Sequence, residues 1–236
     1  MVELLFRSDA YARLCEARVV TVEGQQVLLD RTVFYPAGGG QPGDTGELVT
    51  PEGLRLRVVD TIKGSAPDEV LHVLAEGAER LPSGTVVTAA IDWERRHRLM
   101  RFHTGLHLLC AVVDAPVTGG RMAEDKAHLD FDIEMEKLVA VEIEERLNAL
   151  VAADTPVEIG QISDEELDAN PGLVKTMSVQ PPRGQGSVRT IHIPGVDLQP
   201  CGGTHLVRTG EIGPLKVIRI RSEGKRNKRV TIAFAE

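Results

Sequence analysis

The sequence has few cysteines and no long apolar run, and each feature excludes a class of protein. Three cysteines, an odd number, do not make a disulfide framework, so a reducing compartment fits the chain. No stretch approaches the roughly 18 apolar residues of a membrane-spanning helix, and residues 1–16 contain no apolar run of signal-peptide length. We therefore expect a cytoplasmic protein that is neither secreted nor inserted in a membrane.

The chain also lacks repeats and low-complexity segments. Its 236 residues are 42% hydrophobic and 26% charged, the composition of an ordinary globular protein. A chain of this length can bury one large core or two modest ones.

Net positive charge is missing as well, since the formal charge is −8. The basic residues are nevertheless concentrated. Residues 95–101 hold four arginines and no acid, and residues 216–229 hold seven Lys or Arg and one acid, Glu223. This polarity could steer a polyanion to one face, although solvated strand faces show the same pattern.

The first ninety residues read as β-rich. Alternating apolar residues and turn signals predict strands at 16–23, 26–33, 54–62, 70–75 and 85–91. Residues 34–46 lie between the second and third of these strands and contain five glycines and two prolines. This segment must be a loop with special backbone angles.

At Asp92, a good helix N-cap, the apolar period changes from two to between three and four. We expect a long amphipathic helix that ends near Pro116, a loop at Gly119 and Gly120, and a second helix at 134–153. Strands are expected at 127–133, 156–162, 187–193, 215–221 and 229–234, with a short acidic helix from Ser163. The prediction is an α+β protein with a small β-barrel-like domain at 1–90, followed at 91–236 by helices on an antiparallel sheet.

Two short motifs carry the chemistry. His103 and His107 are spaced i, i+4, and so are Cys201 and His205. On a helix this spacing puts two side chains on one face, ~5–6 Å apart. Three imidazoles and one thiolate make a ligand set typical of zinc, so we expect the two motifs to meet around one Zn²⁺.

The other two cysteines are weaker ligand candidates. Cys110 lies on nearly the same helical face as His103, but ~10 Å further along the axis, too far for a short thiol to share its metal. Cys15 has no ligand-type neighbours. We interpret both as structural.

These motifs resemble the AlaX-type free-standing alanyl-tRNA editing proteins and the related editing domain of alanyl-tRNA synthetase. The resemblance covers nearly the whole chain, and its motifs are residues 34–41 with 44–46, 103–107, 117–120, 201–205 and 218–225 with Arg229. The glycine-rich segment and the domain that holds it are similar to the medium-length members. The chain has no room for aminoacylation machinery, so the implied activity is ATP-independent editing in trans, with no obligate protein partner.

The resemblance also implies roles for individual residues. His103, His107, Cys201 and His205 are the implied zinc ligands, Thr118 belongs to the amino-acid pocket, and Gln41 lies over the same cleft. We therefore count Gln41, Thr104 and Thr118 as catalytic candidates. The candidates for substrate binding are Gly39, Gly40, Gly203, Arg226 and Arg229. The implied reaction is hydrolysis of the ester that joins a wrong amino acid to tRNA(Ala), with serine expected and glycine as a second candidate.

Ester hydrolysis needs an activated water and stabilisation of a developing oxyanion, and zinc with an open position supplies both. Four protein ligands are instead typical of a closed structural site, so the metal could also position the substrate. Two further function classes stay open. A tRNA-binding module with purely structural zinc would bind without turnover. A zinc peptidase would carry Glu in the His-Glu-x-x-His helix, where this chain has Thr104.

Overall fold

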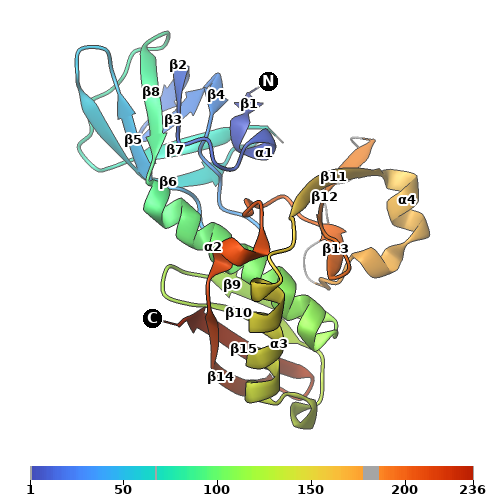
Figure 1. Cartoon of the computed structure of the whole chain (residues 1–236). Helices are drawn as coiled ribbons and strands as arrows, with labels where there is room; N and C mark the ends of the chain where they lie inside the picture. Colours follow the sequence, from blue (N-terminus) through green and yellow to red (C-terminus); the bar gives the residue numbers. More distant parts are fainter. Residues whose placement is uncertain (1, 67, 178–185, 236) are drawn as a thin grey trace. The chain divides into compact units, whose positions relative to one another are not determined.

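The computed structural model describes residues 2–66, 68–177 and 186–235 (Figure 1). The chain divides into two compact units, Met1–Arg98 and Leu99–Glu236. The division falls inside one helix, α2 (Trp93–Val113), which therefore contributes residues to both units. No helix in the described part of the chain is long and apolar enough to cross a membrane.

The first unit is built around a closed antiparallel barrel. Its strands follow the order β2-β3-β7-β6-β5-β8. Their bounds are β2 (Leu14–Glu23), β3 (Gln26–Leu29), β5 (Gly46–Val49), β6 (Arg55–Lys63), β7 (Val70–Leu74) and β8 (Val86–Ile91). A short parallel pair, β1 (Glu3–Leu4) with β4 (Arg31–Thr32), and the single-turn helix α1 (Leu5–Ser8) complete the unit.

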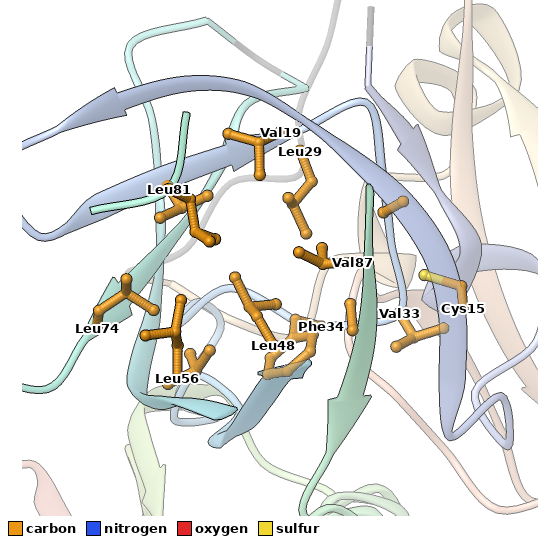
Figure 2. Close-up of a cluster of buried hydrophobic side chains, with 14 of the residues drawn as sticks. Cys15, Val19, Leu29, Val33, Phe34, Leu48, Leu56, Leu74, Leu81 and Val87 are labelled. Atoms are coloured by element: carbon orange, nitrogen blue, oxygen red, sulfur yellow. The ribbon is translucent and has the colours of Figure 1, made fainter. Parts of the chain in front are cut away.

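Alternation along the strands fills the barrel. In β2 the side chains of Cys15, Ala17 and Val19 are buried, while their neighbours in sequence are exposed. Figure 2 shows the resulting cluster, with Phe34 and Leu48 among the side chains that have no exposed surface. Burying side chains of this size contributes ~1.5–3 kcal/mol each, so closing the barrel is the main source of stability in this unit.

The glycine-rich segment after β4 is a firmly held loop. Gly38 and Gln41 exchange two backbone hydrogen bonds of 3.0 Å, and Gly39 and Gly40 between them have φ of 58° and 81°. Positive φ at both central residues defines a tight turn that glycine adopts without strain. The special backbone angles expected for this segment are therefore present.

A buried ion pair fixes the same segment to the start of α2. Asp92 caps the helix, since its side chain accepts a hydrogen bond from Arg95 N at 3.2 Å. One turn later Arg96, fully buried, donates to Asp44, and also to the carbonyl oxygens of Ala10 (3.0 Å) and Val33 (2.7 Å). Asp44 in turn accepts from Tyr35 N at 2.6 Å.

The second unit contains a four-stranded antiparallel sheet in the order β14-β15-β10-β9. The bounds are β9 (Val117–Met122), β10 (Ala127–Phe131), β14 (Leu215–Gly224) and β15 (Asn227–Phe234). Helix α3 (Ala140–Ala152) packs against β14. Helix α2 approaches the same sheet at Gly105, where an added Cβ would lie 3.2 Å from Leu215 and 3.7 Å from Ile232.

A smaller sheet completes the second unit. It consists of β11 (Glu158–Ser163), β12 (Ser187–Ile193) and β13 (Asp197–Pro200), paired antiparallel in that order. Helix α4 (Asp164–Ala169) begins with a capping box formed by Ser163 and Glu166. Among the described residues, 3₁₀ turns lie before α3 (η1, Met135–Lys137), after α4 (η2, Pro171–Leu173) and before β14 (η3, Thr209–Ile212).

The predicted fold class is confirmed: a barrel first, then helices on an antiparallel sheet. Several local expectations were wrong. Helix α2 is not amphipathic, because residues 102–110 are buried on every side, and the strand expected at 26–33 is divided into β3 and β4. Gly119 and Gly120 belong to strand β9 and not to a loop, and the helix expected at 134–153 is shorter, because Leu138 and Val139 have extended backbone angles between η1 and α3.

Candidate metal centre

Helix α2 presents one half of the centre. His103 and His107 lie one turn apart on it, with ring centroids separated by 5.6 Å. Both residues are buried, with 6% and 5% of their surface exposed. Residues 102–110 of the helix are all buried, so the two imidazoles lie within the packed interior.

The loop after β13 supplies the other half. Cys201 N donates to Arg189 O on β12 at 3.1 Å. The guanidinium of Arg189 donates in return to the carbonyl oxygens of Cys201 (2.6 Å) and Gly203 (3.1 Å). Arg189 therefore shapes the loop that carries Cys201 and His205.

The two halves meet. One ligand atom from each of His103, His107, Cys201 and His205 lies within 4.8 Å of the others. The Cys201 Sγ atom is 3.4 Å from His103 Nε2 and 3.2 Å from His205 Nε2. Tetrahedral zinc with ordinary bond lengths separates its N and S ligands by ~3.3–3.6 Å. The donor set and its spacing therefore fit one zinc ion.

Neighbouring groups orient the imidazoles. His107 Nδ1 donates to Asp197 Oδ2 at 2.8 Å, which leaves Nε2 for a metal. His205 Nδ1 lies 3.3 Å from Thr104 Oγ1, while its Nε2 faces Cys201. Hydrogen bonds to the second ring nitrogen are how metal-ligating histidines are usually held.

Electrostatics favours the ligand forms of two residues. Burial raises the pKa of the Cys201 thiol, but the facing imidazoles of His103 and His205 outweigh it and hold this pKa well below the usual value. Burial, together with the charge of His103, holds the pKa of His205 well below its usual value. A thiolate and a neutral imidazole are the forms that bind metal.

His107 behaves differently. Burial lowers its pKa, but the hydrogen bond to Asp197 and the contact with Cys201 outweigh burial and raise the pKa to about 9. Burial raises the pKa of the Asp197 carboxyl, and the bond from His107 overcomes this and lowers it. A metal ion would bind His107 at Nε2 only in its neutral form, so metal binding would release a proton there.

The structure places the two threonine candidates in different surroundings. Thr104 is fully buried, and its hydroxyl accepts from Leu206 N at 3.2 Å as well as contacting His205. Thr118 lies in β9, where its hydroxyl is 2.8 Å from Asn227 Oδ1 and 3.2 Å from Asp130 O. Thr104 thus contacts the metal centre at His205, whereas Thr118 contacts Asp130 on β10 and Asn227 on β15.

The predicted substrate-binding arginines lie by the same two strands. Arg229 makes a two-pronged pair with Asp130, at 2.7 and 2.9 Å. Arg226 pairs with Asp132 at 2.8 Å but keeps 79% of its side chain exposed. Asp130 connects Thr118 with Arg229, since its main-chain carbonyl accepts from Thr118 and its carboxylate accepts from Arg229.

The remaining candidates divide between the units. Gly203 is buried in the Cys201 loop, where its carbonyl accepts from Arg189. Gln41, Gly39 and Gly40 form the tight turn of the first unit, and Gln41 is 2% exposed. Gln41 is thus buried. The sequence predicted only that it lies in a loop, and a loop position does not indicate burial.

Sequence reasoning missed the polar residues around the ligands: Arg189, Lys175, Asp197 and Gln199. Asp197 offered a faint signal, an acid four residues before a ligand cysteine. Lys175 gave none, since its proximity depends on how distant segments pair.

Comparison with known proteins adds to this geometry. Residues 10–95 match the family model of tRNA synthetases class II (A), and residues 188–231 match the threonyl and alanyl tRNA synthetase second additional domain. The chain is 36% identical to the alanyl-tRNA editing protein AlaX-M of Saccharolobus solfataricus, over 98% of both chains. Identity to the AlaX-M protein of Methanosarcina acetivorans is also 36%, over 98% of each.

A longer relative shows the same region in another context. The alanine–tRNA ligase of Metallosphaera sedula is 36% identical over 92% of this chain but only 24% of its own length. The AlaX-M relatives, in contrast, match over 98% of their own length. The chain therefore belongs to the AlaX-M family of alanyl-tRNA editing proteins.

Proposed function

We propose that this protein deacylates mischarged tRNA(Ala) in trans, by hydrolysing the ester that joins serine, and secondarily glycine, to the tRNA. The observation that carries the proposal is the meeting of four metal ligands in a chain that matches editing proteins over its whole length. His103, His107, Cys201 and His205 hold one Zn²⁺. A bound zinc ion would polarise the ester carbonyl or hold the substrate amine at the reacting centre. Because Cys201 must remain a thiolate, the proposal places the protein in the reducing cytoplasm.

Selectivity has to come from polar contacts. The wrong product, Ser-tRNA(Ala), differs from the correct Ala-tRNA(Ala) by one hydroxyl, and alanine is small enough to enter any pocket that admits serine. A site built for a hydroxyl can reject the analogue that lacks it by ~10⁴-fold or more. The discriminating group must therefore pair with the serine hydroxyl.

Thr118 is our candidate for this group. Its hydroxyl has one proton, which Asn227 Oδ1 or Asp130 O already accepts, so its free capacity is that of an acceptor. A serine hydroxyl can donate to it, and alanine cannot. Thr104 is less suited to the role, since its hydroxyl is committed to Leu206 and His205.

The test is a deacylation assay on Ser-, Gly- and Ala-tRNA(Ala), each with and without a zinc chelator. We expect multiple turnovers on the serine substrate, slow or no turnover on the alanine substrate, and loss of activity on chelation. The second candidate function, a tRNA-binding module with structural zinc, is favoured by the four protein ligands. It predicts tRNA binding without turnover on any of the three substrates.

A further inference from the structure

A chain of buried polar groups lies behind His107. Asp197, the first residue of β13, has no exposed side-chain surface. Its Oδ2 accepts hydrogen bonds from His107 Nδ1 at 2.8 Å and from Gln199 Nε2 at 2.7 Å, and its Oδ1 accepts from Lys175 Nζ at 3.0 Å. Three donors thus fix one carboxylate in position and orientation.

These contacts decide what Asp197 can do. Both of its oxygens are engaged, and it is absent from the four-residue set whose ligand atoms converge, so it does not act as a fifth ligand. A carboxylate on Nδ1–H instead selects the tautomer whose Nε2 lone pair faces the metal. Asp197 therefore affects metal binding by orienting His107.

Lys175 reaches Asp197 from a separate segment. Its carbonyl accepts from Val117 N at 2.9 Å, and Met177 N donates to Val117 O at 2.8 Å, so residues 175–177 run along the start of β9. Thr118 is the next residue of that strand. The cation that holds Asp197 is therefore fixed to the strand that carries our selectivity candidate.

The pair of Asp197 and Lys175 also explains how a buried charge is tolerated here. A carboxylate without exposed surface is costly unless it is paired and hydrogen-bonded. Lys175, whose side chain is 25% exposed, supplies the charge, and Gln199 supplies a further donor. Without Lys175 the carboxylate would keep its two other donors but lose the one that fixes Oδ1.

We propose that Asp197 and Lys175 are positioning residues of the metal centre: Asp197 fixes His107 with Nε2 toward the metal, and Lys175 fixes Asp197. The proposal rests on the four-ligand zinc site of the proposed function and on no property of the tRNA substrate. Zinc affinity, measured without tRNA, therefore tests it separately from editing activity.

The experiment measures zinc dissociation constants by competition with a chromogenic chelator, on full-length Asp197→Asn, Lys175→Met and the double variant. Loss of an oriented carboxylate behind a ligand histidine weakens metal binding by about 10- to 100-fold. We expect this loss for Asp197→Asn, a loss of roughly threefold to tenfold for Lys175→Met, and near wild-type affinity for Lys175→Arg, which keeps the cation. Lys126→Met, which removes an exposed lysine paired with the exposed Asp125, is the matched control and should change nothing.

Two further readouts separate positioning from a general structural role. In the double variant the Lys175 substitution should add nothing to the loss from Asp197→Asn, because Lys175 acts through Asp197. Nitrogen-15 NMR of the zinc-loaded protein should show His107 protonated at Nδ1, with that signal altered in Asp197→Asn. If Asp197→Asn fails to fold, Lys175→Met against Lys175→Arg still tests the chain of contacts.

Wild-type zinc affinity in Asp197→Asn would overturn the proposal. So would an equal cost of Lys175→Met with and without the Asp197 carboxylate, since Lys175 would then act by another route. A His107 protonated at Nε2 in the zinc-loaded protein would contradict the assigned tautomer directly.

Discussion

At the scale of single residues, Thr118 carries the sharpest functional prediction. Thr118→Val keeps the shape of the side chain and removes its hydroxyl. We expect Ser-tRNA(Ala) hydrolysis to fall roughly 10- to 100-fold, the cost of leaving a substrate hydroxyl without its partner, while zinc content and tRNA binding stay unchanged. Steady-state kinetics on the serine and alanine substrates measure the change in preference.

Thr104→Val is the comparison variant. It removes the hydroxyl that contacts His205 and accepts from Leu206 N, so we expect it to weaken zinc binding and reduce activity together. If Thr118→Val keeps the wild-type preference for serine and Thr104→Val loses it with zinc intact, the roles of the two threonines are reversed.

His72 gives a residue-scale prediction about pH. It is fully buried in the barrel, bonded to Thr32 Oγ1 at 2.8 Å and to Val27 O at 3.0 Å, and burial lowers its pKa to about 4. In the unfolded chain the pKa is about 6.5, so the unfolded state binds the proton first as pH falls. The contribution of neutral His72 is complete above pH 6.5 and is lost as pH falls to about 4, by up to about 3 kcal/mol.

Denaturant unfolding at several pH values between 4 and 7 tests this. In His72→Gln, which does not titrate, the free energy of unfolding should fall less steeply over that range than in the wild type. Equal slopes for the two proteins would show that another group causes the acid loss.

The residues of the centre were only partly predictable from sequence. The four ligands were found as two i, i+4 pairs, but helix geometry explains that spacing only for His103 and His107 on α2, since Cys201 and His205 lie in a loop. Asp197 and Lys175 could not be found this way, since their contact with His107 depends on how β13 and residues 175–177 are placed. The buried Gln41 is a similar case.

At the scale of elements, one ion pair joins the glycine-rich segment to α2. Asp44 and Arg96 are 1% and 0% exposed, and removing one partner leaves the other charge buried and unpaired. We expect Asp44→Asn to lower the free energy of unfolding by roughly 3–5 kcal/mol. Asp125→Asn, at an exposed pair with Lys126, is the control and should leave it unchanged in the same denaturant titration.

If Asp44→Asn lowers the free energy of unfolding only as much as loss of an exposed pair does, the ion pair is not what holds the segment. The hydrogen bonds to the main chain of Ala10, Val33 and Tyr35 would then be sufficient.

Elements whose apolar residues repeat regularly along the sequence were predicted correctly. Elements that depend on tertiary contacts were not. Helix α2 begins after Asp92 as expected, but it is not amphipathic, because residues 102–110 are buried on every side. Strand β9 was missed because its two glycines read as a loop. An added Cβ at Gly120 would lie 2.6 Å from the tip of the Leu129 side chain, so glycine leaves the space that Leu129 occupies. No local pattern carries that information.

At the scale of the whole molecule, a chain with net charge −8 has to bind a polyanion through a local basic surface. The β14–β15 turn offers one, but not every lysine there is available. Lys228 is buried, and its Nζ donates to the carbonyl oxygens of Gly224 and Lys225, so it stabilises the turn itself. Lys225 and Arg226 remain exposed.

Lys225→Gln with Arg226→Gln should therefore raise KM for the aminoacyl-tRNA and leave kcat unchanged. The slope of log affinity against log salt should fall by roughly one unit for each phosphate that the turn no longer neutralises. Arg57→Gln with Arg80→Gln, at exposed positions of the first unit, makes the same change in net charge and serves as the control. Equal salt slopes in the two double variants would mean that the turn is only a solvated hairpin tip.

We propose that one zinc ion, held by residues of α2 and the loop after β13, is required for the editing activity. The most direct measurement is zinc content and Ser-tRNA(Ala) turnover on the same samples of wild type, His107→Ala and Cys201→Ala. We expect about one zinc per chain in the wild type, and parallel loss of metal and turnover in both variants. Full zinc occupancy in both variants, or full turnover in a variant without zinc, would contradict the claim.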